Sequence, residues 1–330
     1  MGNTFQKGAA PLPLGVNCAL DNFDEDAAKI FEPLLSELEH RDLPPTIYHY
    51  TTDIGLRGIL KSGKLRLTDI FSLNDPSEVR HGYDMAKKVI DEETKDSPTA
   101  YRQFAADFKE PLDAKFEDVA DYFLCSFSVN GDDLGQWRAY ADDGRGFALG
   151  FDTRQLESKF CGVARAVLSG KDVPNGKTFH VTYDDEKLAS IHRQVIKRVL
   201  RCIPDGRNLR SNDPPEWWHR LLIKLAIHVI DASLYFKHKA YLHEQEYRFL
   251  EVHPAKPPAA NIRLRHRGHE LVRYREFDWI SAGQSVLKEV VIGPGVANCK
   301  RAREYVSQCL RDYYLPDVEP ECSRIPYSPR

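Results

Sequence analysis

Two residues near position 50 have side chains that can bind a sugar or an amide. The segment Thr46–Tyr50 is predicted to be a strand, and alternation along a strand makes His49 and Thr51 point the same way. An imidazole beside a hydroxyl can hydrogen-bond a ribose or a carboxamide. The alternative is a histidine on a half-buried strand, with Thr51 or Thr52 capping the helix that follows.

A second candidate is a pair of carboxylates in the segment His243–Leu250. Glu244 and Glu246 share one face if the strand already starts at Glu244. Two carboxylates there can polarise a hydroxyl or stabilise a developing cation. The alternative is an edge strand whose charges are solvated. A zinc metalloprotease motif is excluded, because Tyr247 stands where its second histidine would be.

Hydroxyl and aromatic side chains form a third group, which begins with Ser126 on a predicted strand. Trp137 and Tyr140 are three residues apart, so on a short helix they share a face and can stack on a flat ligand ring. Aromatic residues at this spacing are also common in a core. The glycines that follow do not form GxGxxG, and no Walker A motif exists, so neither a Rossmann site nor a P-loop is supported.

A basic stretch follows the carboxylates in the sequence. Arg263, Arg265 and Arg267 alternate with other residues, so on a strand they form one face. Such a face can bind the phosphates of a dinucleotide or of a nucleic acid. It can equally be an ordinary solvated surface.

The composition limits the class of protein. The 330 residues include 42% hydrophobic and 29% charged residues, which are ordinary values for a globular protein. A net charge of −3 gives no overall attraction to nucleic acid or to an anionic membrane. Seven scattered cysteines without a CxxC pair predict reduced thiols in a cytoplasmic protein, not a zinc module or a disulfide framework. We also expect neither a signal peptide nor a membrane span.

The elements that must position these residues predict a mixed α+β fold. The strongest helices are Asp185–Arg201 and Trp217–Phe236. Further strands are predicted at Tyr122–Ser128, Gly146–Asp152, Thr178–Tyr183, Glu246–Val252 and Leu287–Ile292. Because strands outnumber long helices and do not alternate with them, we expect a mixed, mostly antiparallel sheet with helical insertions.

The chain is expected to have four parts. Residues 1–22 are predicted to be a flexible arm, and residues 23–45 an N-terminal helix capped by Asp24, with a kink at Pro33. The main domain spans 46–312, with a helical insertion at about 185–240, and a Pro-rich tail covers 313–330. Within the domain, Asn74–Pro76 predicts a tight turn that caps a helix over Ser77–Ile90.

The order of the three candidate segments resembles that of poly-ADP-ribose polymerases. His49-Tyr50-Thr51 followed by Gly58-Ile59-Leu60 resembles their HGT or HGS strand and GIL segment, and also the HxT opening of bacterial DNA-targeting ADP-ribosyltransferase toxins and of RNA 2′-phosphotransferases. Glu246-Tyr247 is similar to the Glu-Tyr that supplies their catalytic glutamate. Tyr140 stands where the polymerases have a tyrosine that stacks on nicotinamide. Tyr50 replaces a glycine of the polymerases, so its side chain has to point off the pocket.

The chain also resembles an uncharacterised bacterial domain family over about residues 46–295. The motifs that carry this resemblance are Tyr48–Thr51, Asn74–Glu78, Phe127–Asp152, Phe236–His238, Glu244–Arg248 and Val291–Pro294.

The resemblance implies a fold of the ADP-ribosyltransferase type and NAD as the substrate, with no metal. Glu246, His49 and Glu244 are the expected catalytic residues, and Glu246 would stabilise the ribosyl cation. The expected NAD-binding residues are His49, Tyr50, Thr51, Ser126, Trp137 and Tyr140. The acceptor would be a protein or a nucleic acid, the latter reached through Arg263, Arg265 and Arg267. The family resemblance associates such enzymes with toxins, effectors and antiviral defence.

Two other functions stay open. One is a non-catalytic module that keeps the fold and binds a nucleotide or a nucleic-acid end. The other is a metal-dependent nuclease. Its candidate ligands are Asp75, Glu78, Asp132, Asp133, Glu244 and Glu246, none of which is spaced as a His/Asp metal cluster.

Overall fold

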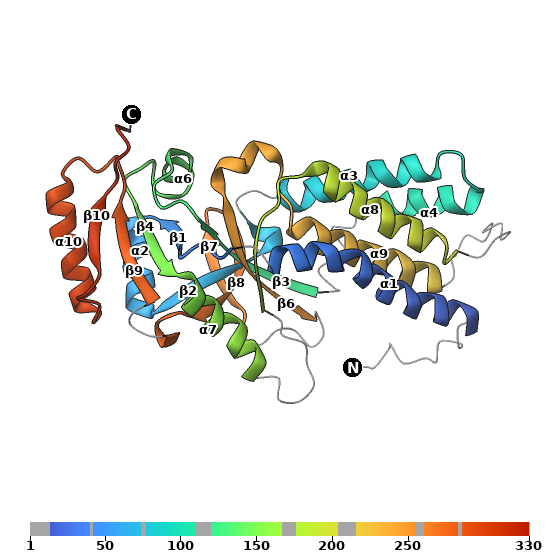
Figure 1. The fold of residues 1–330 in the computed structure, drawn as a ribbon, viewed down its shortest axis with the longest axis horizontal. Helices are drawn as coiled ribbons and strands as arrows, with labels where there is room; N and C mark the ends of the chain where they lie inside the picture. Colours follow the sequence, from blue (N-terminus) through green and yellow to red (C-terminus); the bar gives the residue numbers. More distant parts are fainter. Residues whose placement is uncertain are drawn as a thin grey trace. The chain divides into compact units, whose positions relative to one another are not determined.

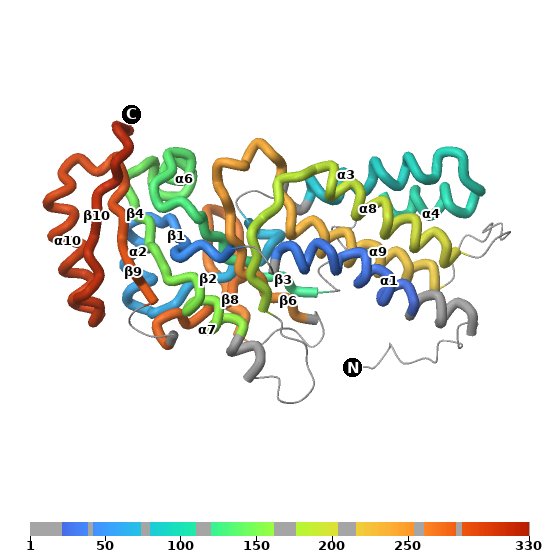
Figure 2. The backbone as a smooth tube through the Cα atoms, viewed as in Figure 1, coloured from blue at the N-terminus to red at the C-terminus, as the bar shows by residue number. Residues whose placement is uncertain are grey.

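The computed structural model describes residues 14–39, 42–73, 77–109, 120–166, 176–203, 216–254, 261–282 and 286–329 (Figures 1 and 2). The chain divides into two compact units. The first takes Met1–Glu37, Glu78–Val119 and Asp184–Phe236, and the second takes Leu38–Ser77, Ala120–Tyr183 and Lys237–Arg330. The predicted helical insertion is therefore part of a separate unit, to which two earlier segments also contribute.

The described residues of the first unit are helical. Its helices are α1 (Leu14–Glu39), α3 (Ser77–Thr94), α4 (Thr99–Lys109), α8 (Asp185–Leu200) and α9 (Glu216–Leu234). Figure 1 shows α8 alongside α9. The predicted apolar stripe of α8, which includes Leu188 and Val195, is buried. Helices in this unit are thus held by their amphipathic faces.

Helix α1 differs from its prediction. It begins at Leu14, inside the expected arm, and Asp24 lies within it instead of capping it. There the Asp24 carboxylate pairs with Lys224 of α9. The buried stripe of α1 already includes Phe23, which extends the packing to before Asp24, and the helix continues through Pro33. The predicted turn Asn74–Pro76 lies outside the described residues, and α3 begins at Ser77.

The second unit is built on a ten-stranded sheet. Its strands are β1 (Thr46–Thr51), β2 (Lys64–Asp69), β3 (Ala120–Ser128), β4 (Phe147–Asp152), β5 (Gly176–His180), β6 (Glu246–Pro254), β7 (Arg263–Arg267), β8 (Glu270–Asp278), β9 (Leu287–Ile292) and β10 (Glu319–Cys322). The main path runs β10-β9-β4-β1-β3-β2-β8-β7, with β6 beside β3 and β5 beside β6. Only the β10–β9 pair is parallel among the strand pairs of the described residues. The predicted α+β class with a mostly antiparallel sheet is confirmed.

Strand β3 is the branch point of this sheet. Along one edge it pairs with β6 over its whole length, from Ala120 to Ser128. Its other edge is shared, because β1 pairs with it at Ser128 and β2 pairs with it at Phe123 and Leu124. The backbone of β3 between these two pairings therefore faces a split between β1 and β2.

The helices of the second unit are α2 (Asp53–Ser62), α6 (Leu134–Tyr140), α7 (Thr153–Ala166) and α10 (Cys299–Asp312), with short 3-10 turns η1 (Ile70–Ser72), η2 (Lys239–Glu244) and η3 (Ile280–Ala282). Helix α2 ends at Gly63, which takes the left-handed conformation with φ of 65° and donates its N–H to the Ile59 carbonyl. Thr52 caps the other end by accepting the Gly55 N–H.

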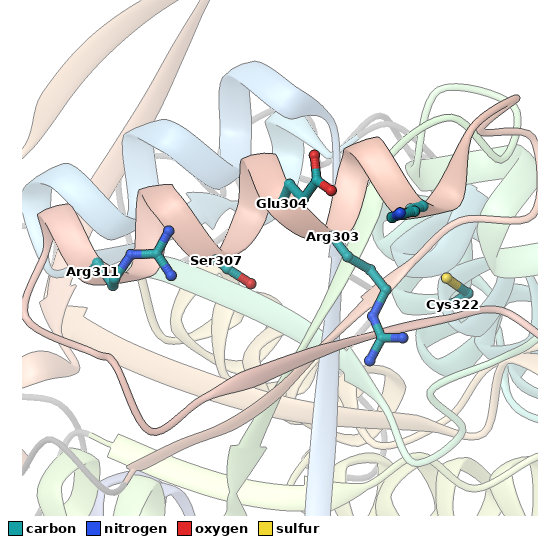
Figure 3. Close-up of a pocket in the computed structure, with 6 residues that line it drawn as sticks. Arg303, Glu304, Ser307, Arg311 and Cys322 are labelled. Carbon is teal, nitrogen blue, oxygen red and sulfur yellow. The ribbon is translucent and has the colours of Figure 1, made fainter.

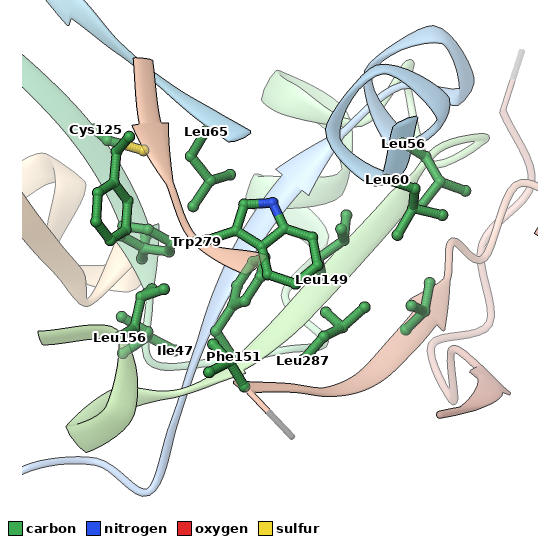
Figure 4. Packing of buried hydrophobic residues seen from close by; sticks show 14 of the residues in the cluster. Ile47, Leu56, Leu60, Leu65, Cys125, Leu149, Phe151, Leu156, Trp279 and Leu287 are labelled. Atoms are coloured by element: carbon green, nitrogen blue, oxygen red, sulfur yellow. The ribbon is translucent and has the colours of Figure 1, made fainter. Parts of the chain in front are cut away.

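The main core of this unit lies on one face of the sheet and is made by alternate strand residues. Trp279 is fully buried among Ile47, Leu149 and Phe151 (Figure 4). The rings of Trp279 and Phe151 are 5.3 Å apart in an edge-on contact. None of the described helices is long and apolar enough to cross a membrane.

One pair of cysteines corrects the expectation of reduced thiols. Cys299 and Cys322 form a disulfide across a Cα–Cα distance of 6.3 Å. The bond joins the start of α10 to β10. A sequence separation of 23 residues gave no CxxC signal, because the two cysteines meet only when the strand packs beside the helix.

We expect Gly58→Ala and Gly55→Ala, two substitutions in α2, to change stability in opposite directions. A Cβ at Gly58 meets no atom within 4 Å, so alanine should stabilise the helix by about 0.5–1 kcal/mol. A Cβ at Gly55 would lie 1.9 Å from the Thr51 hydroxyl oxygen, so that alanine should destabilise the fold. Urea unfolding measures both changes, and Thr51→Ala should partly restore Gly55→Ala. A shift of the same sign in both single variants would contradict this packing.

Candidate functional site

Glu246 is held at the start of β6 by its backbone. Its N–H donates to the Tyr183 hydroxyl oxygen at 2.9 Å, and its carbonyl accepts the Val181 N–H at 3.0 Å. The preceding Gln245 has a left-handed conformation with φ of 42°, which turns the chain from η2 into the strand. Because Glu246 pairs with Ser128, the two side chains lie on the same face of the sheet.

The Glu246 carboxylate accepts four hydrogen bonds. Ser126 Oγ donates to Oε1 at 2.6 Å, and Lys237 Nζ donates to Oε2 at 3.2 Å. Arg248 donates to both oxygens, from Nε to Oε1 at 2.8 Å and from Nη2 to Oε2 at 3.0 Å. Arg248 can do this because it follows Glu246 by two residues and so shares its face.

Glu244 is linked to Glu246 by Lys237, which donates a hydrogen bond to both carboxylates. Its Oε2 accepts a hydrogen bond from Lys237, and its Oε1 accepts one from the Tyr140 hydroxyl at 3.3 Å. The Glu244 carbonyl accepts from Ser128 Oγ at 2.8 Å. Lys237 also lies over the ring of Tyr241, 4.8 Å from its centroid.

We call these four charged residues, Lys237, Glu244, Glu246 and Arg248, the ionic network. All four are buried, and the two cations balance the two carboxylates. Burial alone would raise the pKa of Glu246, but Arg248 and Lys237 outweigh it and hold that pKa well below its ordinary value of 4.5. Glu246 is therefore ionised throughout the physiological pH range, and it is a weak proton acceptor.

His49 lies on the other side of the sheet from Glu246. By register, Tyr48, Ser128 and Glu246 share a face, so the next residue of β1 points the opposite way. The His49 ring accordingly contacts the edge of the buried Phe127 ring, with centroids 5.7 Å apart. Thr51, on the same face as His49, packs against Gly55 of α2.

His49 and Glu246 nevertheless meet at one residue, Ser126. Nδ1 of His49 lies 3.2 Å from the Ser126 carbonyl oxygen, at the split between β1 and β2. A carbonyl only accepts, so Nδ1 carries the proton and Nε2 is the remaining acceptor. Burial lowers the pKa of His49, which keeps the ring neutral at neutral pH. The backbone of Ser126 thus contacts His49, while its hydroxyl contacts Glu246.

The aromatic candidates separate into packing residues and one site residue. Trp137 is fully buried, 4.8 Å from the ring of Tyr50, and its Nε1 donates to Asp132 at 2.7 Å. Tyr50 was expected to point off the pocket, but the pairing register places it on the face of Glu246, where its hydroxyl donates to the Asn130 carbonyl and accepts the Asp133 N–H. Tyr140 is 36% exposed, and its hydroxyl donates to Glu244 of the ionic network.

Lys237, Arg248 and Tyr183 were not predicted. Arg248 could have been found, since strand alternation places it on the face of Glu246. Lys237 could not, because it reaches both glutamates only through the turn of η2. Tyr183 contacts Glu246 across the end of β5, which depends on tertiary pairing.

The acidic residues proposed as nuclease ligands have other roles where they are described. Asp133 caps α6 by accepting the Gln136 N–H, and Asp132 accepts from Ser323 Oγ and the Arg324 N–H. Asp75 and the side chain of Glu78 lie outside the described residues. In the part of the chain that the structure describes, no group of three His, Cys, Asp or Glu residues is placed to hold a metal ion.

A groove of about 500 Å³ lies at the β10 edge of the sheet, along α10 (Figure 3). Arg303 crosses it and donates from Nε to the Pro320 carbonyl at 2.9 Å. The lining residues are Lys300, Arg303, Glu304, Ser307, Arg311 and Cys322. None of the residues predicted for the site lines this groove, and β9, β4, β1 and β3 separate β10 from β6 in the sheet.

Residues 136–249 match the model of a family described as a protein of unknown function, DUF2971. This stretch contains Tyr140 and the whole ionic network, whereas His49 and Ser126 precede it. No curated protein and no solved structure matches the chain significantly. The resemblance to an uncharacterised domain family is thus supported over residues 136–249, and the match does not extend to any ADP-ribosyltransferase.

We expect Lys237→Met to destabilise the fold by about 3–5 kcal/mol, because it leaves two buried carboxylates with less compensating charge. Lys64 provides the matched control, since its ion pair with Glu276 is partly exposed. Lys64→Met should cost less than about 1 kcal/mol. Urea denaturation at pH 7 measures the unfolding free energy of both variants. Similar losses in the two would show that the buried charges of the ionic network do not depend on Lys237.

The ionic network also predicts a pH dependence. The folded-state pKa of Glu246 lies below its ordinary value, so its charge stabilises the fold fully above about pH 4.5 and less as the pH falls toward 2. The gap in unfolding free energy between the wild type and Glu246→Gln should therefore narrow from pH 5 to pH 3. Urea titrations at several pH values measure it, and a gap that widens would contradict the lowered pKa.

Proposed function

We propose that this chain is a NAD-dependent ADP-ribosyltransferase or NAD glycohydrolase, in which Glu246 stabilises the ribosyl cation. The observation that carries the proposal is a buried carboxylate kept ionised by Arg248 and Lys237 and reached by the exposed Ser126. The order of segments that resembles poly-ADP-ribose polymerases supports NAD as the substrate.

The lowered pKa favours charge stabilisation over proton transfer. A general base works best when its pKa lies near the working pH, and Glu246 is far below it. A fixed negative charge is suited to a developing oxocarbenium ion, whose positive charge grows as the glycosidic bond breaks. The low pKa of Glu246 therefore supports charge stabilisation, rather than proton transfer, as its role in the proposed reaction.

The proposed reaction breaks the bond between C1′ of the nicotinamide ribose and the ring nitrogen. The bonding electron pair leaves with nicotinamide, and the resulting ribosyl cation is attacked by an acceptor or by water, which then releases a proton. Glu246 faces the cation. We further propose that a ribose hydroxyl takes the place of Ser126 on Oε1, because Lys237 and Arg248 are buried and Ser126 is exposed.

The neighbours of Glu246 take supporting roles in this proposal. Tyr140 faces the nicotinamide ring, and Glu244, to which Tyr140 is bonded, positions the acceptor. His49 lies on the opposite face of the sheet from Glu246, so in this proposal its Nε2 reaches NAD only at the split between β1 and β2, beside the Ser126 carbonyl that engages Nδ1. A role in toxicity or antiviral defence belongs to the same proposal and rests on the family resemblance. Cytoplasmic location is proposed separately, from the scattered cysteines, of which Cys125, Cys161, Cys202 and Cys309 are free thiols.

A non-catalytic nucleotide-binding module is the second candidate. It is favoured because the Glu246 carboxylate already accepts four hydrogen bonds from its own chain. In that case Glu246 would hold the fold of the site, and NAD would bind without being cleaved.

Glu246→Gln should lower the rate of nicotinamide release from NAD by about a hundredfold or more, with little change in NAD affinity. Glu251→Gln is the matched control, because Glu251 lies on the same strand and pairs with Arg275 at 2.7 Å outside the ionic network. Chromatography of NAD and nicotinamide measures the rate, and thermal unfolding confirms that each variant is folded. Unchanged NAD cleavage in folded Glu246→Gln would remove the proposal, and NAD binding without cleavage by the wild type would favour the second candidate.

Three milder variants keep the test informative if Glu246→Gln does not fold. Ser126→Ala should retain turnover and not weaken NAD binding, since the substrate displaces that hydroxyl. Glu244→Gln should cost less than Glu246→Gln, and His49→Ala should raise KM more than it lowers kcat. A large loss of kcat in Ser126→Ala alone would contradict the displacement.

A further inference from the structure

The outward face of β2, β8 and β7 carries more positive than negative charge. Thr68, Tyr274 and Arg263 are aligned across the three strands, so alternate residues on either side of them share this face. The opposite face holds core residues such as Leu65 and Phe277, and on the outward face Val272 and Tyr274 are buried. The cationic side chains of the outward face are Lys64, Arg66, Arg263, Arg265 and Arg267, and its carboxylates are Glu270, Glu276 and Asp278.

Three of the five cations are neutralised by this set of carboxylates. Lys64 and Arg263 both pair with Glu276, at 3.0 and 3.2 Å. Arg267 pairs with Glu270 at 3.2 Å. Arg66 and Arg265 have no carboxylate within ion-pair distance among the described residues, so the excess charge of the face is concentrated on them.

The two remaining arginines are close enough for their charges to interact, and one of them lies over a buried ring. The Arg66 guanidinium lies over Tyr274, 4.9 Å from the ring centroid, and Tyr274 is buried. Arg265 is half-buried, and its Nε is shielded from solvent without an acceptor among the described residues. Burial and the nearby charges of Arg66 and Arg267 lower the pKa of Arg265. Two like charges and an unmatched donor are held together at a cost to stability, which an anion would relieve.

We propose that Arg66 and Arg265 bind a phosphate group of a nucleic acid or of a nucleotide. Guanidinium groups match phosphate oxygens through paired N–H donors, and Arg265 has a donor that lacks a partner. Neighbouring strands are about 5 Å apart, so the face from β2 to β7 extends over about 10 Å, enough for more than one phosphate. Tyr274 is covered by Arg66, which leaves phosphate rather than base as the recognised group. The proposal is independent of NAD cleavage.

The four arginines supply their own controls. Arg66→Gln and Arg265→Gln should weaken binding of a fluorescent single-stranded oligonucleotide by about tenfold, whereas the neutralised Arg263→Gln and Arg267→Gln should change it much less. Fluorescence anisotropy over a salt series measures this, and each of the first two variants should reduce the salt slope by about 1. Equal losses in all four variants would overturn the assignment to Arg66 and Arg265.

Competition identifies the source of the phosphate. Displacement of the oligonucleotide by a similar concentration of pyrophosphate would assign the site to a nucleotide, whereas resistance to pyrophosphate would assign it to nucleic acid. If the wild type binds neither probe, the proposal is wrong.

Thermal unfolding separates phosphate binding from a purely structural role, because the two roles predict opposite changes in the Tm of Arg265→Gln. Without ligand, Arg265→Gln should melt above the wild type, because it removes a like-charge contact and an unmatched buried donor. Pyrophosphate or the oligonucleotide should raise the Tm of the wild type and of Arg263→Gln, but not that of Arg265→Gln. A lowered Tm in Arg265→Gln together with unchanged binding would show that Arg265 serves the fold alone.

Discussion

Four buried charges at the start of β6 depend on one another. The pKa of Glu246 is low because Arg248 and Lys237 are beside it, and Lys237 donates a hydrogen bond to Glu244 as well. The desolvation of four charges is tolerated because their hydrogen bonds are mutually satisfied, and the removal of one member leaves the others uncompensated. The positions of Ser126, Ser128, Tyr140 and Tyr183 are in turn set by bonds to Glu244 and Glu246.

The two clusters of charge in this unit differ in their balance. In the ionic network two cations balance two carboxylates, and all four side chains are buried. On the outward face of β2, β8 and β7, Arg66 and Arg265 have no carboxylate among the described residues. Paired charges stabilise the local fold, whereas unpaired cations attract anionic ligands from solution. We therefore place the proposed chemistry at the first cluster and the proposed phosphate binding at the second.

Local patterns predicted much of this fold, and tertiary contacts account for the rest. The predicted strands include β1, β3, β4 and β9 within one or two residues of their observed bounds. Alternation also predicts that His49 and Tyr50 point to opposite faces of the sheet. Only the pairing register shows that Tyr50, and not His49, lies on the face of Glu246. The start of α1 and the Cys299–Cys322 bond depend on packing partners distant in the sequence. No local rule predicts that Lys237 lies between two glutamates.

The bond between Ser126 and Glu246 joins residues 120 positions apart. A contact that closes so long a loop forms slowly. During synthesis it can form only after the ribosome has made β6. Synthesis at about 5–20 residues per second puts roughly 6–24 seconds between the two residues. During that interval one edge of β3 has no neighbour, and Phe127 lacks its packing against Phe249. A nascent chain therefore has Ser126 long before it has the carboxylate that makes the site, so any activity of this site begins only after β6 has been synthesised.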